Sequence, residues 1–71
     1  MIPLTLAPVG TAGKIGKITG NSDVRRHLED MGFTAGTGIT VISAMGENLI
    51  VNVKNVRIAI SQEAAKRIMM I

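Results

Sequence analysis

The segment Ser22–Gly36 constrains the fold most, because it is the one place where a helix start signal, a helical repeat and a stop signal coincide. Ser22 is a favourable N-cap residue, and Asp23 places negative charge at the positive end of the helix dipole. Gly32 can end the helix in the left-handed conformation at little cost. The segment therefore predicts a helix over about residues 22–32.

The apolar positions of this helix form a single stripe. Val24, Leu28 and Met31 follow one another at i, i+4 and i+7. Phe33, the only aromatic residue, comes directly after the stop signal and can fold back onto the stripe. Because a helix of about three turns cannot bury such a stripe alone, we expect the flanking segments to supply the wall that covers it.

Those flanking segments are short and alternate in hydrophobicity, as strands with one buried face do. A further helical turn is expected over about residues 61–67, capped by Ser61. Glycines within the second strand, Gly13 and Gly16, suggest a bulge, a bend or a close backbone approach. The expected strands are Leu4–Leu6, Thr11–Thr19, Ile39–Ala44, Leu49–Val53, Val56–Ile60 and Ile68–Ile71. The sequence thus predicts a mainly β fold, a small and strongly curved antiparallel barrel of five or so strands plugged by one helix.

Length and composition narrow the class of protein. Seventy-one residues form one domain, residues 1–71, and the absence of cysteine excludes a disulfide or a thiolate zinc site. No apolar run approaches the ~18 residues that a membrane-spanning helix needs. The N-terminal segment has no basic flank, and Pro3 comes early, so a signal peptide is not expected. We therefore expect a cytoplasmic protein that does not insert into a membrane.

The charge balance is modestly basic, with eight Lys and Arg against five Asp and Glu. A net charge of +3 is typical of a solvated surface, and it also suits an acidic partner. The residues that could form a basic footprint for nucleic acid are Arg25, Arg26, Lys14, Lys17, Lys54 and Arg57. Proteins that bind single-stranded nucleic acid stack the bases on aromatic rings, and Phe33 is the only aromatic residue here. Nucleic-acid binding is therefore kept only as an alternative.

One cluster on the predicted helix has metal-ligand chemistry. Asp23, His27 and Asp30 follow at i, i+4 and i+7 and project from one flank, so they could hold Fe²⁺ or another divalent metal weakly. The other interpretation is a solvated surface on which His27 is hydrogen-bonded to a neighbouring carboxylate. No nucleophile and base can be paired, because Ser22 and Ser61 are explained as caps. We therefore expect no enzyme, no firmly bound cofactor and no small-molecule substrate.

Protein contact is the remaining possibility. Arg25 and Arg26 lie on the helix faces away from the stripe, with Glu29 as an expected partner for Arg25. Met45, in a turn beside Leu49, offers an adaptable apolar contact. We take Arg25, Arg26, Met45 and Leu49 as candidate partner-binding residues.

Several of these stretches together resemble a known family. The run RRHLEDMGFTAGT at residues 25–37, followed by ITVIS, NLIVNV and RIAISQEAAKRIMMI, is similar to FeoA, the small SH3-like partner of bacterial ferrous iron transport. The resemblance covers essentially the whole chain. It implies an SH3-like barrel and a non-catalytic accessory protein that binds the cytoplasmic part of FeoB, a membrane GTPase and iron permease, and so is peripheral to the inner membrane. Similar domains end iron-dependent repressors of the DtxR type, so a detached domain of such a regulator is an alternative.

Overall fold

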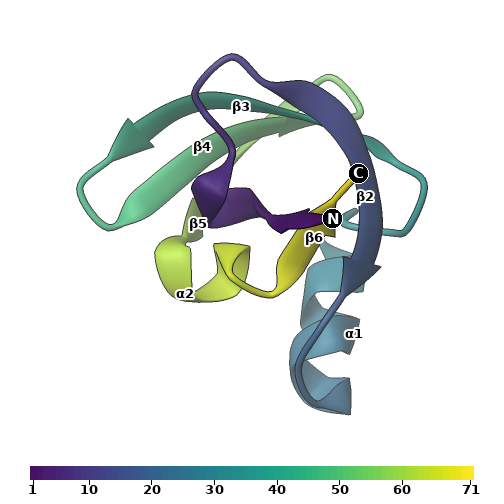
Figure 1. Cartoon of the computed structure of the whole chain (residues 1–71). Coiled ribbons are helices and arrows are strands. Elements are labelled where there is room, and N and C mark those ends of the chain that lie inside the picture. Colours follow the sequence, from purple (N-terminus) through teal and green to yellow (C-terminus); the bar gives the residue numbers. More distant parts are fainter.

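The computed structural model describes all residues, 1–71, as six strands and three short helical segments (Figure 1). In chain order the elements are β1 (Ile2–Pro3), the 3₁₀ helix η1 (Leu4–Leu6), β2 (Ala12–Ile18), α1 (Ser22–Asp30), β3 (Gly38–Met45), β4 (Asn48–Val53), β5 (Val56–Ser61), α2 (Gln62–Ala65) and β6 (Ile68–Met70). The strands form one antiparallel sheet in the order β1-β6-β2-β3-β4-β5. The predicted mainly β fold is confirmed.

Strand β2 gives the sheet its curvature. Its first residues, Ala12–Lys14, pair with β3, and residues from Ile15 onward pair with β6. The β2–β6 pairing contains a register shift between Ile15 and Lys17. Gly13 lies where a Cβ atom would come 2.9 Å from the backbone oxygen of Ile71, closer than side chains tolerate. Gly13 therefore allows a close backbone approach, one of the possibilities expected for the glycines of this strand. Figure 1 shows β2 bending over the molecule from β3 towards α1.

Strands β3, β4 and β5 form a meander whose inner face is apolar. The β4–β5 connection is the two-residue turn Lys54–Asn55, with φ angles of 53° and 65°. Both residues are thus in the left-handed region that two-residue hairpin turns require. This turn sets a register in which Val53 faces Val56 and the alternate residues of β4 point inward.

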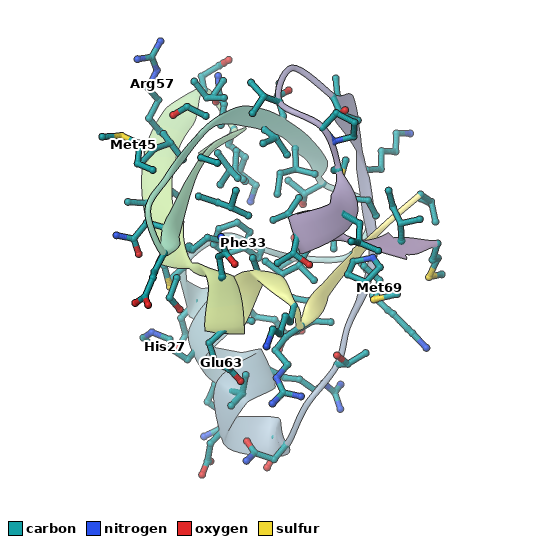
Figure 2. The ribbon with its side chains drawn as sticks, turned by 60° about the vertical axis from the view of Figure 1, so that its left-hand side comes forward. His27, Phe33, Met45, Arg57, Glu63 and Met69 are labelled. Carbon is teal, nitrogen blue, oxygen red and sulfur yellow. The ribbon has the colours of Figure 1, made fainter.

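The core contains only hydrophobic side chains, and no buried side-chain nitrogen or oxygen lacks a hydrogen-bond partner. Phe33 is completely buried at its centre and lies inside the curled sheet (Figure 2). The buried residues are Leu4, Ala7, Ile15, Leu28, Phe33, Ile39, Val41, Leu49, Val51, Val53, Ile60, Ala65, Ile68 and Met70. Val24 and Met31 pack against this core while half-buried, so α1 does plug the barrel, chiefly through Leu28.

The ends of α1 differ slightly from the prediction. Asn21, not Ser22, is the N-cap, because its side-chain oxygen accepts a hydrogen bond from the backbone N–H of Val24 at 2.9 Å. Ser22 is already the first helical residue. The helix ends at Asp30 rather than 32, and Gly32 follows with a φ of 103°, in the left-handed conformation expected of a stop signal.

Two other expectations need correction. Leu4–Leu6 is a 3₁₀ helix rather than a strand, because the chain turns to bury Leu4 and the Ala7 N–H donates to the Leu4 carbonyl at 3.1 Å. The helical turn predicted at 61–67 is the shorter α2, whose cap is confirmed by the Ala64 N–H donating to Ser61 Oγ at 3.2 Å.

Strands β1 and β5, at the two ends of the sheet, do not pair with each other. The elements that directly follow them, η1 and α2, contact each other instead. The barrel is therefore completed by helical segments rather than by a continuous ring of strand hydrogen bonds.

Candidate functional site

The largest hollow of the molecule is a groove of ≈ 510 Å³ between α1 and α2. One wall comes from the first turns of α1 and the other from the end of β5, from α2 and from the residues just after it. The lining residues are Asp23, Val24, His27, Leu28, Ser61, Glu63, Ala64 and Arg67.

A smaller hollow of ≈ 220 Å³ continues along α1 to Met31 and along β5 to Ala59. Four residues line both hollows, namely His27, Leu28, Ser61 and Ala64. The two hollows are therefore parts of one surface depression, which we call the α1–α2 groove.

The apolar part of this groove is a consequence of where α1 lies. The N-terminal end of α1 extends beyond the barrel (Figure 1). Leu28 is buried against the core, whereas Val24, one helical turn earlier, is only half-buried and lines the groove. Ala64 faces it from α2, and its short side chain leaves space between the two helices. The groove thus has an apolar lining of Val24, Leu28 and Ala64 that water can reach.

Polar side chains lie along both edges of the groove. Asp23 and His27 come from α1, and Glu63 and Arg67 from the α2 side. Glu63 accepts ion-pair contacts from Lys66 Nζ at 3.5 Å and Arg67 Nη2 at 3.7 Å. All three of these side chains are exposed, so the pairs contribute about 0–1 kcal/mol and can be exchanged for contacts with a partner.

The predicted metal cluster is not assembled in the structure. Asp23 and His27 both line the α1–α2 groove, but Asp30 does not. No three His, Cys, Asp or Glu side chains lie close enough together to hold a metal ion. Figure 2 shows His27 and Glu63 on the two helical segments that border the groove.

The predicted partner-binding residues are divided between the surface and the core. Arg25 and Arg26 are exposed, and neither lines the groove. Arg25 makes no ion pair with Glu29, since the ion pairs of this chain are those of Glu63.

Met45, the last residue of β3, is 64% exposed and remains available for contact. The assignment of Leu49 to a contact surface is wrong: only 5% of it is exposed. The reason is the strand register. Leu49 faces Ile60 across the hairpin, on the inner side of β4, so its side chain belongs to the core.

The contribution of α2 to the wall of the groove was not predicted from the sequence. No site role was predicted for Glu63, Ala64 or Arg67, which line the groove. A helix of four residues gives no periodicity from which an exposed face can be read, and the groove depends on how α2 packs relative to α1.

The family model for the FeoA domain matches residues 2–70. The chain belongs to the FeoA family. Among curated proteins, none matches this FeoA-family chain.

Solved structures of family members share its fold closely. A crystal structure of an iron uptake regulatory protein, FeoA, is 36% identical, covering 99% of this chain and 93% of that chain with a TM-score of 0.91. FeoA of Stenotrophomonas maltophilia in complex with zinc, described as a prokaryotic SH3 domain protein, is 25% identical, covering 100% and 91% with a TM-score of 0.86. The FeoA-family chain therefore has the SH3-like fold.

A regulator with the same fold is more distant. A manganese-dependent transcriptional repressor is 15% identical and covers 97% of this FeoA-family chain but 40% of its own, with a TM-score of 0.89. At that identity the similarity shows a shared fold alone.

No helix of the FeoA-family chain is long and apolar enough to cross a membrane.

Proposed function

We propose that this FeoA-family chain is a non-catalytic accessory protein of ferrous iron transport. In this proposal it works in the cytoplasm, binds the cytoplasmic part of an FeoB-type membrane GTPase and modulates its GTPase cycle or assembly. The support is family membership over residues 2–70 and the description of S. maltophilia FeoA as a possible ferrous iron transport activating factor.

The observation that carries the proposal is the α1–α2 groove. It combines an apolar lining of Val24, Leu28 and Ala64 with charged edges, and it opens to solvent. Protein partners anchor themselves by placing an apolar side chain in such a hollow while polar groups at the rim fix its orientation. We infer that an apolar side chain from a segment of the transporter enters between α1 and α2.

The charged side chains at the two edges of the groove would orient a bound partner segment. Arg67 lies on one side of the groove and Asp23 on the other, and Arg26 is an exposed cation on α1 outside the groove. A partner segment with an acidic residue beside its apolar anchor could pair with Arg67. The FeoA-family chain would lose little, because the ion pair between Arg67 and Glu63 is exposed and weak. Arg25, Arg26 and Met45 remain candidate contacts outside the groove.

The proposal can be tested by isothermal titration of this chain with the purified cytoplasmic domain of the FeoB-type protein. Ala64→Glu places a charged side chain in the apolar part of the groove and should weaken binding at least tenfold. Ala35→Glu is the matched control, because Ala35 is exposed and does not line the groove. Its affinity should stay within twofold of the parent.

Two outcomes would count against the proposal. One is the absence of any heat of binding at high micromolar concentrations. The other is equal weakening by both variants, which would place the contact outside the groove. Circular dichroism of each variant establishes that the fold is retained before the titration is interpreted.

A further inference from the structure

The outer surface of β1, β6 and β2 carries apolar side chains that the proposed contact does not use. Ile15 and Met70 pair with each other and are buried, so the residues that alternate with them along the strands point outward. Ile71 exchanges backbone hydrogen bonds with Lys14, at 2.8 and 3.2 Å, and Met69 pairs with both Lys17 and Pro3. We call this the β1–β6–β2 face: Met1, Pro3, Met69, Ile71, Lys14 and Lys17.

The two most exposed apolar side chains of this face, Met1 and Ile71, form one patch. Met1 is 66% exposed and Ile71 is 65% exposed. A Cβ atom at Gly16 would lie 3.0 Å from both the Met1 Cε and the Ile71 Cγ2, so both side chains lie over this glycine. The missing side chain at Gly16 thus lets them join into a single exposed surface. Methionine suits such a surface because its side chain is flexible and adapts to an irregular neighbour.

The charged side chains of this face are all basic. Lys14 and Lys17 are exposed, and neither makes an ion pair. The acidic side chains lie elsewhere, in α1 (Asp23, Glu29 and Asp30), in the β3–β4 turn (Glu47) and in α2 (Glu63). The face is therefore complementary to a negatively charged surface.

The absence of a hollow on the β1–β6–β2 face indicates which kind of binding partner it suits. None of the hollows in the molecule is lined by Met1, Met69, Ile71, Lys14 or Lys17. A peptide anchors through a pocket or groove, and this outer side of a curled sheet offers none, whereas a bilayer needs only exposed apolar chains and nearby cations. Met69 is half-buried and lies on the side of the molecule opposite Met45 and His27 (Figure 2).

We infer that the β1–β6–β2 face rests on an anionic phospholipid surface. The methionine and isoleucine side chains enter the headgroup region, and Lys14 and Lys17 bind lipid phosphates. Binding is weak and reversible, since each lysine near an anionic bilayer strengthens it only about fivefold. Contact through this face leaves the α1–α2 groove, lined by other residues, open to a protein partner.

Vesicle flotation with the tag-free protein tests this inference without any protein partner. We expect binding to vesicles of phosphatidylcholine with 40% phosphatidylglycerol at low salt, and its loss on pure phosphatidylcholine or at 0.5 M KCl. Lys14→Glu combined with Lys17→Glu should weaken the partition coefficient at least tenfold. Ile71→Ser should weaken it several-fold. Because only lipid is present, failure here leaves the proposed binding to the transporter untouched.

The matched control reverses two basic residues elsewhere. Lys54→Glu combined with Arg57→Glu changes the net charge equally, at exposed positions of the β4–β5 hairpin, and should keep at least half of the binding. Equal loss in both double variants would overturn the inference, as would the absence of flotation on anionic vesicles at low salt. Binding of a DNA duplex or polyglutamate through Lys14 and Lys17 with equal or higher affinity would also overturn it, by assigning the face to another acidic partner.

Discussion

The backbone N–H of Phe33 donates to the carbonyl oxygen of Leu28 at 3.0 Å, and both side chains are buried. The N–H of Gly32 donates in turn to the carbonyl of Glu29 at 3.0 Å. Together these bonds form the Schellman motif that ends α1. They join the end of the helix to the core residue Phe33 and so fix the wall of the α1–α2 groove.

The first prediction concerns Gly32, whose φ of 103° is strained for any residue with a Cβ atom. Gly32→Ala should destabilise the protein by about 1–2 kcal/mol, measured by urea unfolding. The cost is conformational, because the nearest atom to the added methyl group, Val53 Cγ1, is 4.0 Å away. Gly38→Ala is the control, since its φ is not positive and its nearest contact is 3.9 Å. Equal losses in the two variants would contradict this explanation.

The second prediction separates the two candidate caps of α1. Asn21→Ala removes the acceptor for the Val24 N–H and should cost about 1 kcal/mol of unfolding free energy. Ser22→Ala should change it by less than about 0.5 kcal/mol, because Ser22 is exposed and makes no capping bond. Thermal unfolding followed by circular dichroism measures both. A larger effect at Ser22 than at Asn21 would favour the cap expected from sequence.

The third prediction distinguishes the two apolar residues that the sequence suggested as contacts. Leu49→Ala should destabilise the protein by about 2–5 kcal/mol, because it leaves a cavity in the core. Met45→Ala should change stability by less than about 0.5 kcal/mol, since most of its side chain is already in water. Urea unfolding of the two variants gives the comparison. Comparable stabilities would mean that Leu49 is not a core residue.

Local signals predicted most of the fold. The Gly32 stop and the Ser61 cap each follow from a residue type and its immediate neighbours, and the structure contains both. Leu4–Leu6 could not be read correctly, because a three-residue alternation does not separate a strand from a 3₁₀ turn that buries one leucine.

The site was less predictable, because it depends on packing between segments far apart in the chain. Val24 and Ala64 are forty residues apart, and each is unremarkable alone. Leu49 was misplaced because its exposure is set by the pairing of β4 with β5 rather than by its closeness to a turn. Asp23 and His27 both line the groove, but the residues across it come from the end of β5, from α2 and from Arg67 just after it, and Asp30 is not among the lining residues.

Amide chemical-shift mapping tests the central claim most directly. The ¹⁵N-labelled chain is titrated with the unlabelled cytoplasmic domain of the FeoB-type transporter. The proposed docking predicts that the largest shifts cluster at Val24, Leu28 and Ala64, which line the α1–α2 groove. Shifts confined to the β3–β4 turn or to the β1–β6–β2 face, with the groove unchanged, would contradict it.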